Sequence, residues 1–293
     1  MKKFSRIGAL LVTALALAGV SVAGAQGGSK GQLPAHLPDL KGREVVAVTA
    51  QDYTPLTFVD PETGKGVGME YEIWAEICLR LNCKLTWKVA AWDGMIVAIN
   101  KKQFDVGMDG ISITDDRKKQ VDFSDAYLNV EQHFLVRADE KAFKDKASFV
   151  ADKKLRIGSQ AGTSGFFTAA DILGLKENET SDRLKLYDNF GISVQALLKG
   201  DVDAVISDVA AGKGYIGANA GKLKLLDETL SSDTLGFIFP QGSDLVAPVN
   251  AALASMKYDG FLGYEQNKWF FLYDPSTAST SSAASTAAAT TAK

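Results

Sequence analysis

The 293-residue chain contains 32 Lys and Arg against 35 Asp and Glu, which gives a formal net charge of −3. A weakly acidic chain without basic clusters binds nucleic acid and anionic membranes poorly, so we exclude both from its expected partners. Residues 42–271 exceed the usual size of one domain, and this length makes two lobes plausible.

Residues 1–25 have the pattern of a secretory signal peptide. Three basic side chains lie among the first six residues, an apolar run follows over 7–22, and Ala-Gly-Ala ends the segment as a cleavage site. The alternative is a membrane-spanning helix, which needs ~20 apolar residues, and this run is shorter. Because no cysteine follows the cleavage site, we expect no lipid anchor and place the protein in the periplasm.

The two ends of the mature chain are expected to lack regular structure. Residues 26–40 are rich in Gly, Pro and Lys and are interpreted as a flexible leader. From residue 276 onward, only Ser, Thr, Ala and a final Lys occur. Such a composition cannot bury enough apolar surface to fold, so residues 274–293 are predicted to be a disordered tail.

Between these ends, strand and helix patterns alternate. Residues 44–50 are rich in β-branched side chains and predict a buried strand. Apolar residues then recur every four positions over 69–81 and predict an amphipathic helix. Further strands are expected at 84–89, 104–108, 154–159, 183–188, 201–208 and 235–240. Further helices are expected at 92–102, 165–173, 191–199, 244–257 and 261–269. Such alternation predicts an α/β fold with mainly parallel sheets.

The chain has two cysteines, Cys78 and Cys83. In an oxidising compartment a close pair can form a disulfide, which is the interpretation we favour. The alternative is a buried Cys78 on the helix and an unrelated Cys83 at the next strand. The two histidines, His36 and His133, lie far off in sequence, so we expect no metal site and no cofactor.

The first candidate site follows the strand at 104–108. The chain passes through Gly110 and the hydroxyl of Ser112 before it reaches Arg117. An arginine side chain has five donors in a planar fork, which suits it to hold a carboxylate in two places. The alternative is a surface ion pair of Arg117 with a nearby aspartate.

A second candidate is the segment 156–167, with the sequence RIGSQAGTSGFF. The small residues Gly162, Thr163 and Ser164 lie between a predicted strand and a predicted helix, where exposed backbone N–H groups form an anion site. The segment lacks the GK[ST] ending of a nucleotide-binding P-loop. The alternative is an ordinary turn in which Thr or Ser caps the helix.

A third candidate is Asp208, just beyond the carboxyl end of an apolar strand. Open α/β sheets place ligand-binding groups at this edge, although Asp208 could instead cap the helix that follows. Two aromatic residues complete the set: Tyr53 lies in the turn after the first strand, and Trp92 opens a helix. Either aromatic side chain could instead belong to the core.

In combination and order, these segments resemble the polar amino-acid receptors of ABC importers, solute-binding protein family 3, which include glutamine-, histidine- and lysine/arginine/ornithine-binding proteins. The likeness covers 42–271, and its most specific block is 92–127. The resemblance implies an α/β, two-lobed periplasmic binding protein of type II. Each lobe would be a mainly parallel sheet flanked by helices, with a two-strand hinge between the lobes. Lobe 1 would comprise 40–127 and 237–273, and lobe 2 would comprise 132–232.

The resemblance also implies how a ligand is held. Its α-carboxylate would be bound by Arg117, Ser112, Thr163 and Ser164. Its ammonium group would be bound by Gly110, Ser112 and Asp208. A zwitterion needs a cation and an anion close together, because charges taken out of water are costly unless each is paired. Since the two charged residues fall in different predicted lobes, ligand would favour a closed form.

The part of the pocket that would receive the ligand's side chain departs from the known receptors. Tyr53 and Trp92 would sandwich this side chain. Gln160 stands where the glutamine receptor has Lys, and Ser207 stands where that receptor has His. Ala50 replaces an Asp that glutamine and basic amino-acid receptors commonly carry.

The loss of that Asp weakens the argument for Lys, Arg or His as ligand, although Asp52, Asp109 or Glu131 could compensate. The preferred amino acid is therefore not identified. We expect an extracytoplasmic receptor, monomeric and not an enzyme, that delivers an L-amino acid to an ABC permease.

Two alternatives remain open. One is a cyclohexadienyl-dehydratase-like enzyme on the same scaffold, which would need a general acid with a raised pKa, and Glu131 is the candidate. The other is a sensor that binds the same ligands and signals to a separate partner.

Overall fold

The computed structural model describes residues 36–176, 179 and 181–273. The predicted signal peptide, most of the predicted leader and the predicted tail lie outside the described residues. All described residues fall in a single structural unit. In that part of the chain, no helix has the length and hydropathy that a bilayer crossing requires.

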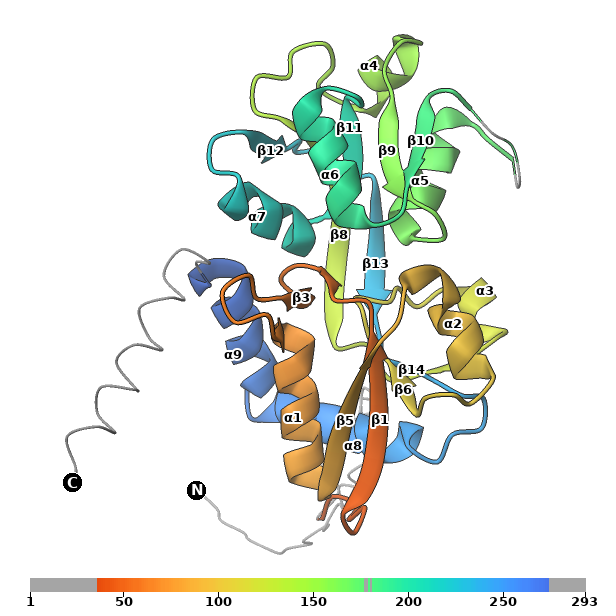
Figure 1. Cartoon of the computed structure of the whole chain (residues 1–293), viewed down its shortest axis with the longest axis vertical. Coiled ribbons are helices and arrows are strands. Elements are labelled where there is room, and N and C mark those ends of the chain that lie inside the picture. The colour runs from red at the N-terminus through yellow and green to blue at the C-terminus, as the bar shows by residue number, and fades with distance from the viewer. Residues whose placement is uncertain (1–35, 177–178, 180, 274–293) are drawn as a thin grey trace, which may run out of the picture. The chain divides into compact units, whose positions relative to one another are not determined.

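The first of two large sheets has the strand order β5-β1-β6-β14-β7 (Figure 1). Its strands are β1 (Arg43–Thr49), β5 (Cys83–Val89), β6 (Val106–Gly107), β7 (Asp122–Phe123) and β14 (Ile238–Phe239). Strand β1 is parallel to β5 and β6, whereas β14 is antiparallel to β6 and β7. Its helices are α1 (Met69–Leu81), α2 (Trp92–Asn100), α3 (Asp115–Lys118), α8 (Val246–Tyr258), α9 (Phe261–Asn267) and the π-helix η1 (Lys268–Leu272).

The second sheet has the order β10-β9-β11-β8-β12, and β13 also pairs with β8. Its strands are β8 (Leu128–Arg137), β9 (Ile157–Gln160), β10 (Leu184–Tyr187), β11 (Ala204–Asp208), β12 (Leu223–Leu225) and β13 (Ser231–Leu235). Strands β10, β9 and β11 are parallel, and β8 is antiparallel to its three partners. Its helices are α4 (Lys146–Ala151), α5 (Ser164–Leu173), α6 (Phe190–Lys199) and α7 (Val209–Ala218). A small third sheet is formed by β2 (Asp52–Tyr53), β3 (Thr57–Val59) and β4 (Gly66–Val67).

Helices cover both faces of each large sheet. Alternate side chains of β1 point to opposite faces, so Val45 packs with α1, α8 and α9 while Val48 packs with α2. In the second sheet, Phe134 of β8 packs with α4 and α5 while its neighbour Leu135 packs with α6 and α7. This layering confirms the predicted α/β fold.

Strand β8 belongs to both cores. Its first half, with Leu128 and Val130, is buried in the core of the first sheet, and its second half, with Phe134, is buried in a core of the second. Strand β13 pairs with the first half of β8, and Figure 1 shows the two running together between the sheets. Two adjacent strands therefore connect two separately packed lobes, although the exact lobe limits remain a prediction.

Several predicted strands are shorter in the structure, and two of them differ most from the prediction. Of the expected strand at 104–108, only Val106–Gly107 pair with their neighbours. The strand expected at 235–240 is divided, because Leu235 ends β13 and pairs with β8, whereas β14 covers Ile238–Phe239 in the first sheet. The chain changes partners between them, which an apolar run cannot reveal.

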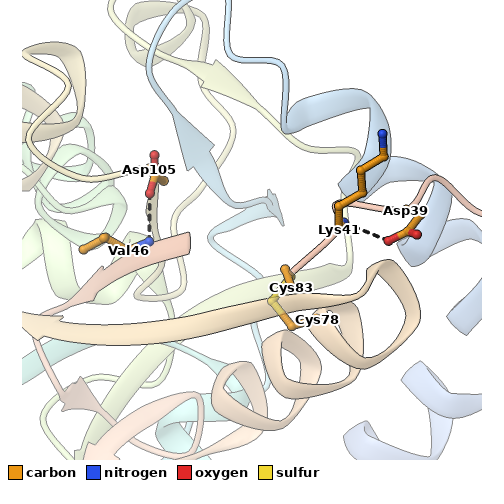
Figure 2. The surroundings of a disulfide bond; sticks show 6 residues. All are labelled: Asp39, Lys41, Val46, Cys78, Cys83 and Asp105. Atoms are coloured by element: carbon orange, nitrogen blue, oxygen red, sulfur yellow. Dashed lines mark hydrogen bonds between the residues drawn. A yellow bond between two sulfur atoms is a disulfide. The ribbon is translucent and has the colours of Figure 1, made fainter. Parts of the chain in front are cut away.

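Cys78 and Cys83 form a disulfide in the structure (Figure 2). Cys78 lies in the last turn of α1, and Cys83 is the first residue of β5. Between them, Asn82 takes a left-handed conformation (φ 53°) and its N–H donates to the Cys78 carbonyl, which ends the helix. The bridge thus ties the end of α1 to the start of the adjacent strand.

Candidate ligand-binding site

All nine residues predicted to bind ligand line one pocket. These residues are Tyr53, Trp92, Gly110, Ser112, Arg117, Gln160, Thr163, Ser164 and Asp208. The rest of the lining consists of Asp52, Asp109, Gln132, Gly165, Phe190 and Ile206. The empty space that these residues surround is about 500 Å³, including the part that is open to solvent. Elements of both lobes contribute to its wall.

Arg117, on α3, is buried and not part of a surface ion pair. Its guanidinium donates to the Ser112 carbonyl at 2.8 Å and to the Gly162 carbonyl at 3.0 Å. Its Cζ atom also lies 5.1 Å from the centroid of the Trp92 ring. Burial lowers the pKa of Arg117 to about 10, so the side chain stays charged at neutral pH. This cation has no carboxylate ion-pair partner among the described residues.

The start of α5 faces the same pocket. Thr163 caps this helix: its hydroxyl accepts from the Phe166 N–H at 3.1 Å and donates to the Gln160 carbonyl at 2.8 Å. That hydroxyl hydrogen is therefore in use, and Thr163 would offer a ligand its backbone N–H instead. The Ser164 hydroxyl accepts from the Gln132 amide at 2.7 Å. The segment is both a capped turn and a wall of the pocket.

Asp208 likewise combines the two roles that the sequence left open. One carboxylate oxygen accepts from the Ala211 N–H at 2.9 Å and caps α7. The same side chain lines the pocket and is only 3 % exposed. Burial raises the pKa of Asp208 to about 6, so most molecules carry its negative charge at neutral pH. Arg117 and Asp208 thus present opposite charges to one pocket.

Gly110 is held by groups behind the pocket wall. Its φ of +61° suits glycine, and an added Cβ would lie 2.5 Å from the Tyr53 ring. Its N–H donates to the Glu70 carboxyl at 3.0 Å, and the Tyr127 hydroxyl donates to the same oxygen. Glu70 is fully buried, and this burial raises its pKa to about 7. Glu70 therefore holds the peptide group that precedes Gly110, next to the carbonyl that was predicted to bind the ligand ammonium.

Asp52 and Asp109 lie on the pocket wall, whereas Glu131 does not. The Glu131 side chain is 60 % exposed, and its carboxylate lies 3.8 Å from Nε2 of His133. Three acids were candidates to compensate for the aspartate that Ala50 replaces. Of these, Glu131 lies too far from the pocket to do so. Asp109 is buried and accepts hydrogen bonds from the hydroxyls of Thr49 and Thr57.

Comparison with known proteins decides the family. The sequence profile described as "Bacterial extracellular solute-binding proteins, family 3" matches residues 45–271. The chain belongs to this family. An L-cystine-binding protein of Bacillus subtilis is 31 % identical to this solute-binding protein over 79 % of this chain and 83 % of its own length.

Solved structures share the fold of this family 3 solute-binding protein. The arginine-, lysine-, histidine-binding protein of Geobacillus stearothermophilus superimposes with a TM-score of 0.71 at 29 % identity, covering 80 % of this chain and 98 % of its own. An ancestral amino acid-binding protein, described as a precursor of cyclohexadienyl dehydratase, has a TM-score of 0.69 at 28 % identity. It covers 78 % of this chain and 95 % of its own.

Sequence reasoning missed several residues of the pocket of this solute-binding protein. Gln132 shares a face of β8 with buried Leu128 and Val130, so a polar residue in this alternating pattern was a usable signal. Gln132 also donates to Asp233 of β13 at 2.6 Å. Phe190, which contacts Tyr53 edge-to-face, follows a helix-capping Asn and looks like any core aromatic residue.

Proposed function

We propose that the protein is a periplasmic receptor that binds an L-amino acid between its two lobes and delivers it to an ABC permease. One observation carries this proposal: Arg117 and Asp208 face the same pocket from different lobes. A free amino acid is a zwitterion, and only such a pair can neutralise both of its charges at once. The named binding functions of relatives, for cystine, histidine and arginine, support the same ligand class.

In the proposed complex, the α-carboxylate binds the guanidinium fork of Arg117 and the N–H groups at the start of α5. A helix N-terminus favours an anion because its first N–H groups have no partner within the helix. The ammonium group binds Asp208, the Gly110 carbonyl and the Ser112 hydroxyl. Tyr53 and Trp92 supply aromatic surface for the rest of the ligand.

Ligand is proposed to stabilise the closed arrangement of the lobes. Polar contacts already cross the pocket: Arg117 donates to the Gly162 carbonyl, and the Ser112 hydroxyl lies 3.2 Å from that of Ser164. An amino acid held by both sides adds bonds that an open form could not make. The equilibrium would therefore shift toward closure.

The structure does not support Glu131 as the general acid of a dehydratase-like enzyme. Elimination of water needs a general acid within reach of the ligand, and Glu131 lies outside the pocket. We propose a binding protein that works as a monomer, with no cofactor and no nucleic-acid partner.

The variant Arg117→Ala tests the proposed function. Truncating one partner of a buried charge pair costs about 2–5 kcal/mol, so the affinity for an amino acid should fall by at least about 30-fold. Calorimetric titration with L-arginine, L-histidine and L-cystine, compared with the exposed Arg156→Ala as control, measures the effect. A folded Arg117→Ala protein that binds as tightly as the wild type would refute the assignment.

A further inference from the structure

Two carboxylates, Asp52 and Asp109, lie side by side on the pocket wall. Asp52 comes from β2 and Asp109 from the segment after β6. Their side chains are within hydrogen-bonding reach of each other, and Asp109 is only 7 % exposed. They form a second polar group in the pocket, which we call the acidic pair.

The charges in the pocket do not balance for a simple zwitterion. The described lining has one basic side chain, Arg117, and three acidic ones, Asp52, Asp109 and Asp208. The α-carboxylate and the ammonium of an amino acid neutralise Arg117 and Asp208. In the described chain, no Lys, Arg or His forms an ion pair with the acidic pair. The nearby Gln160 brings an amide to Asp52, and not a charge.

A purely structural role does not explain both acids. The hydroxyls of Thr49 and Thr57 donate to Oδ1 of Asp109, but an Asn would accept the same two bonds without burying a charge. Burying an uncompensated carboxylate costs several kcal/mol. Two neighbouring carboxylates on the wall of a binding pocket are therefore explained better by a cation that the ligand supplies.

We propose that the acidic pair binds a positively charged ligand side chain, so that the receptor selects amino acids such as arginine or lysine over neutral and acidic ones. This inference rests on the proposed function, because it assumes that Arg117 and Asp208 hold the backbone end of the ligand. A guanidinium fork can donate to two carboxylates at once. A ligand whose side chain carries only a carboxylate, such as glutamate, would place a negative charge near the pair with no second pocket cation to neutralise it.

Proton uptake and release would follow from this arrangement. Burial raises the pKa of both acids, and the charge of Asp52 raises that of Asp109 further. The free protein therefore keeps a proton on the pair at higher pH than exposed aspartates would. A bound cation takes the place of that proton, so affinity for a cationic ligand should rise with pH. The other titratable or charged groups around the pair are Glu70 and Tyr71 of α1, Tyr127, Tyr215 of α7, and, across the pocket, Arg117, Asp208 and Asp233.

The decisive comparison uses L-arginine and L-citrulline, which have nearly the same shape and differ in side-chain charge. Calorimetric titration of the wild-type protein, refolded free of ligand, should give at least about 30-fold tighter binding for arginine, as expected for charged hydrogen bonds. Asp208 would lose its proton with either ligand, so the excess proton release with arginine, measured in buffers of different ionisation heat, reports on the pair. Repeating this in Glu70→Gln removes the contribution of that neighbouring acid.

Two isosteric variants locate the effect. Asp52→Asn and Asp109→Asn should each reduce the preference for arginine over citrulline by at least about 10-fold, because each removes one charge and keeps an acceptor oxygen. The exposed Asp182→Asn should leave this preference unchanged. If either pocket variant fails to fold, the ligand comparison on the wild type still decides.

The outcomes separate this inference from the proposed function. If citrulline, glutamine or glutamate binds as tightly as arginine and lysine while Arg117→Ala abolishes binding, the proposed function stands and the cation subsite is overturned. If no amino acid binds at all, both the proposed receptor function and the cation subsite are refuted. Strong preference for arginine or lysine that is lost in the Asn variants supports the subsite.

Discussion

Asp208 performs two tasks with one side chain. A cap for α7 and a pocket carboxylate were alternatives in the sequence, yet the structure makes the cap and lines the pocket with the same residue. The cap holds the carboxylate in place before any ligand arrives. Because ordered side chains lose less entropy on binding, such preorganisation favours tight binding.

Glu70 lies behind the pocket wall, where it accepts a hydrogen bond from Gly110. Its ionisation should make the free energy of unfolding depend on pH. Its pKa in the folded state, about 7, lies above its ordinary value of 4.5. This raised pKa favours the folded state below about pH 4.5, and the contribution disappears as pH rises through 7. Between pH 5 and 8, ionisation of Glu70 should therefore lower the free energy of unfolding by on the order of 3 kcal/mol.

The variant Glu70→Gln keeps an oxygen for the Gly110 N–H and for the Tyr127 hydroxyl but cannot ionise. Its melting temperature should match the wild type near pH 5 and exceed it above pH 7. The exposed Glu62→Gln is the control and should follow the wild type throughout. Parallel melting curves for Glu70→Gln and wild type across this range would show that Glu70 does not titrate as stated.

At the scale of elements, local periodicity predicted some parts well and others not at all. Helix α1 occupies the predicted residues Met69–Leu81, because its apolar side chains repeat at helical spacing against one core. The pattern did not mark β8 and β13. The first half of β8 faces one core and the second half another, so its apolar positions follow no single face. The hinge was expected from family resemblance alone, whereas the carboxylate-binding role of Arg117 also followed from the chemistry of its side chain.

The pocket could be predicted only in part for a related reason. Arg117 and Asp208 stand out because charged residues beside apolar strands are unusual. Phe190 became a pocket residue through tertiary packing of α6, which no local pattern records, whereas Gln132 is a polar residue in the buried alternation of β8 and could have been found. The two residues of the acidic pair come from separate segments of the chain, so the sequence did not show that they are neighbours. It indicated them only as possible replacements for the aspartate that is missing at position 50.

The disulfide is an element-scale feature that should affect stability and not binding. It closes a loop of about six residues, for which the reduction in unfolded-chain entropy is worth about 2 kcal/mol. The double variant Cys78→Ala, Cys83→Ala should melt several degrees lower yet bind ligand as the wild type does, since neither residue lines the pocket. Thiol titration should find no reactive thiol in native protein and two after reduction. Two thiols in untreated, oxidised protein would contradict the bridge.

At the scale of the whole molecule, two lobes with separate cores meet at a pocket that contains opposite charges. Strands β8 and β13 link the lobes, and both polar contacts and the contact between the Tyr53 and Phe190 rings cross the pocket. Opening such a hinge would break these contacts, while each sheet keeps its own strand pairing. A ligand that contacts both lobes would then stabilise the folded, closed form as a whole.

The most direct test of the receptor assignment is a thermal-shift screen against the twenty amino acids and some related cyclic and dicarboxylic acids, using mature protein unfolded and refolded to remove bound ligand. A ligand that binds only the folded state stabilises it by about 2.7 kcal/mol at 100 times its Kd. We predict a clear rise in melting temperature with one or a few L-amino acids, cationic ones first. If no amino acid raises the melting temperature while a cyclic or dicarboxylic acid does, the receptor assignment is contradicted.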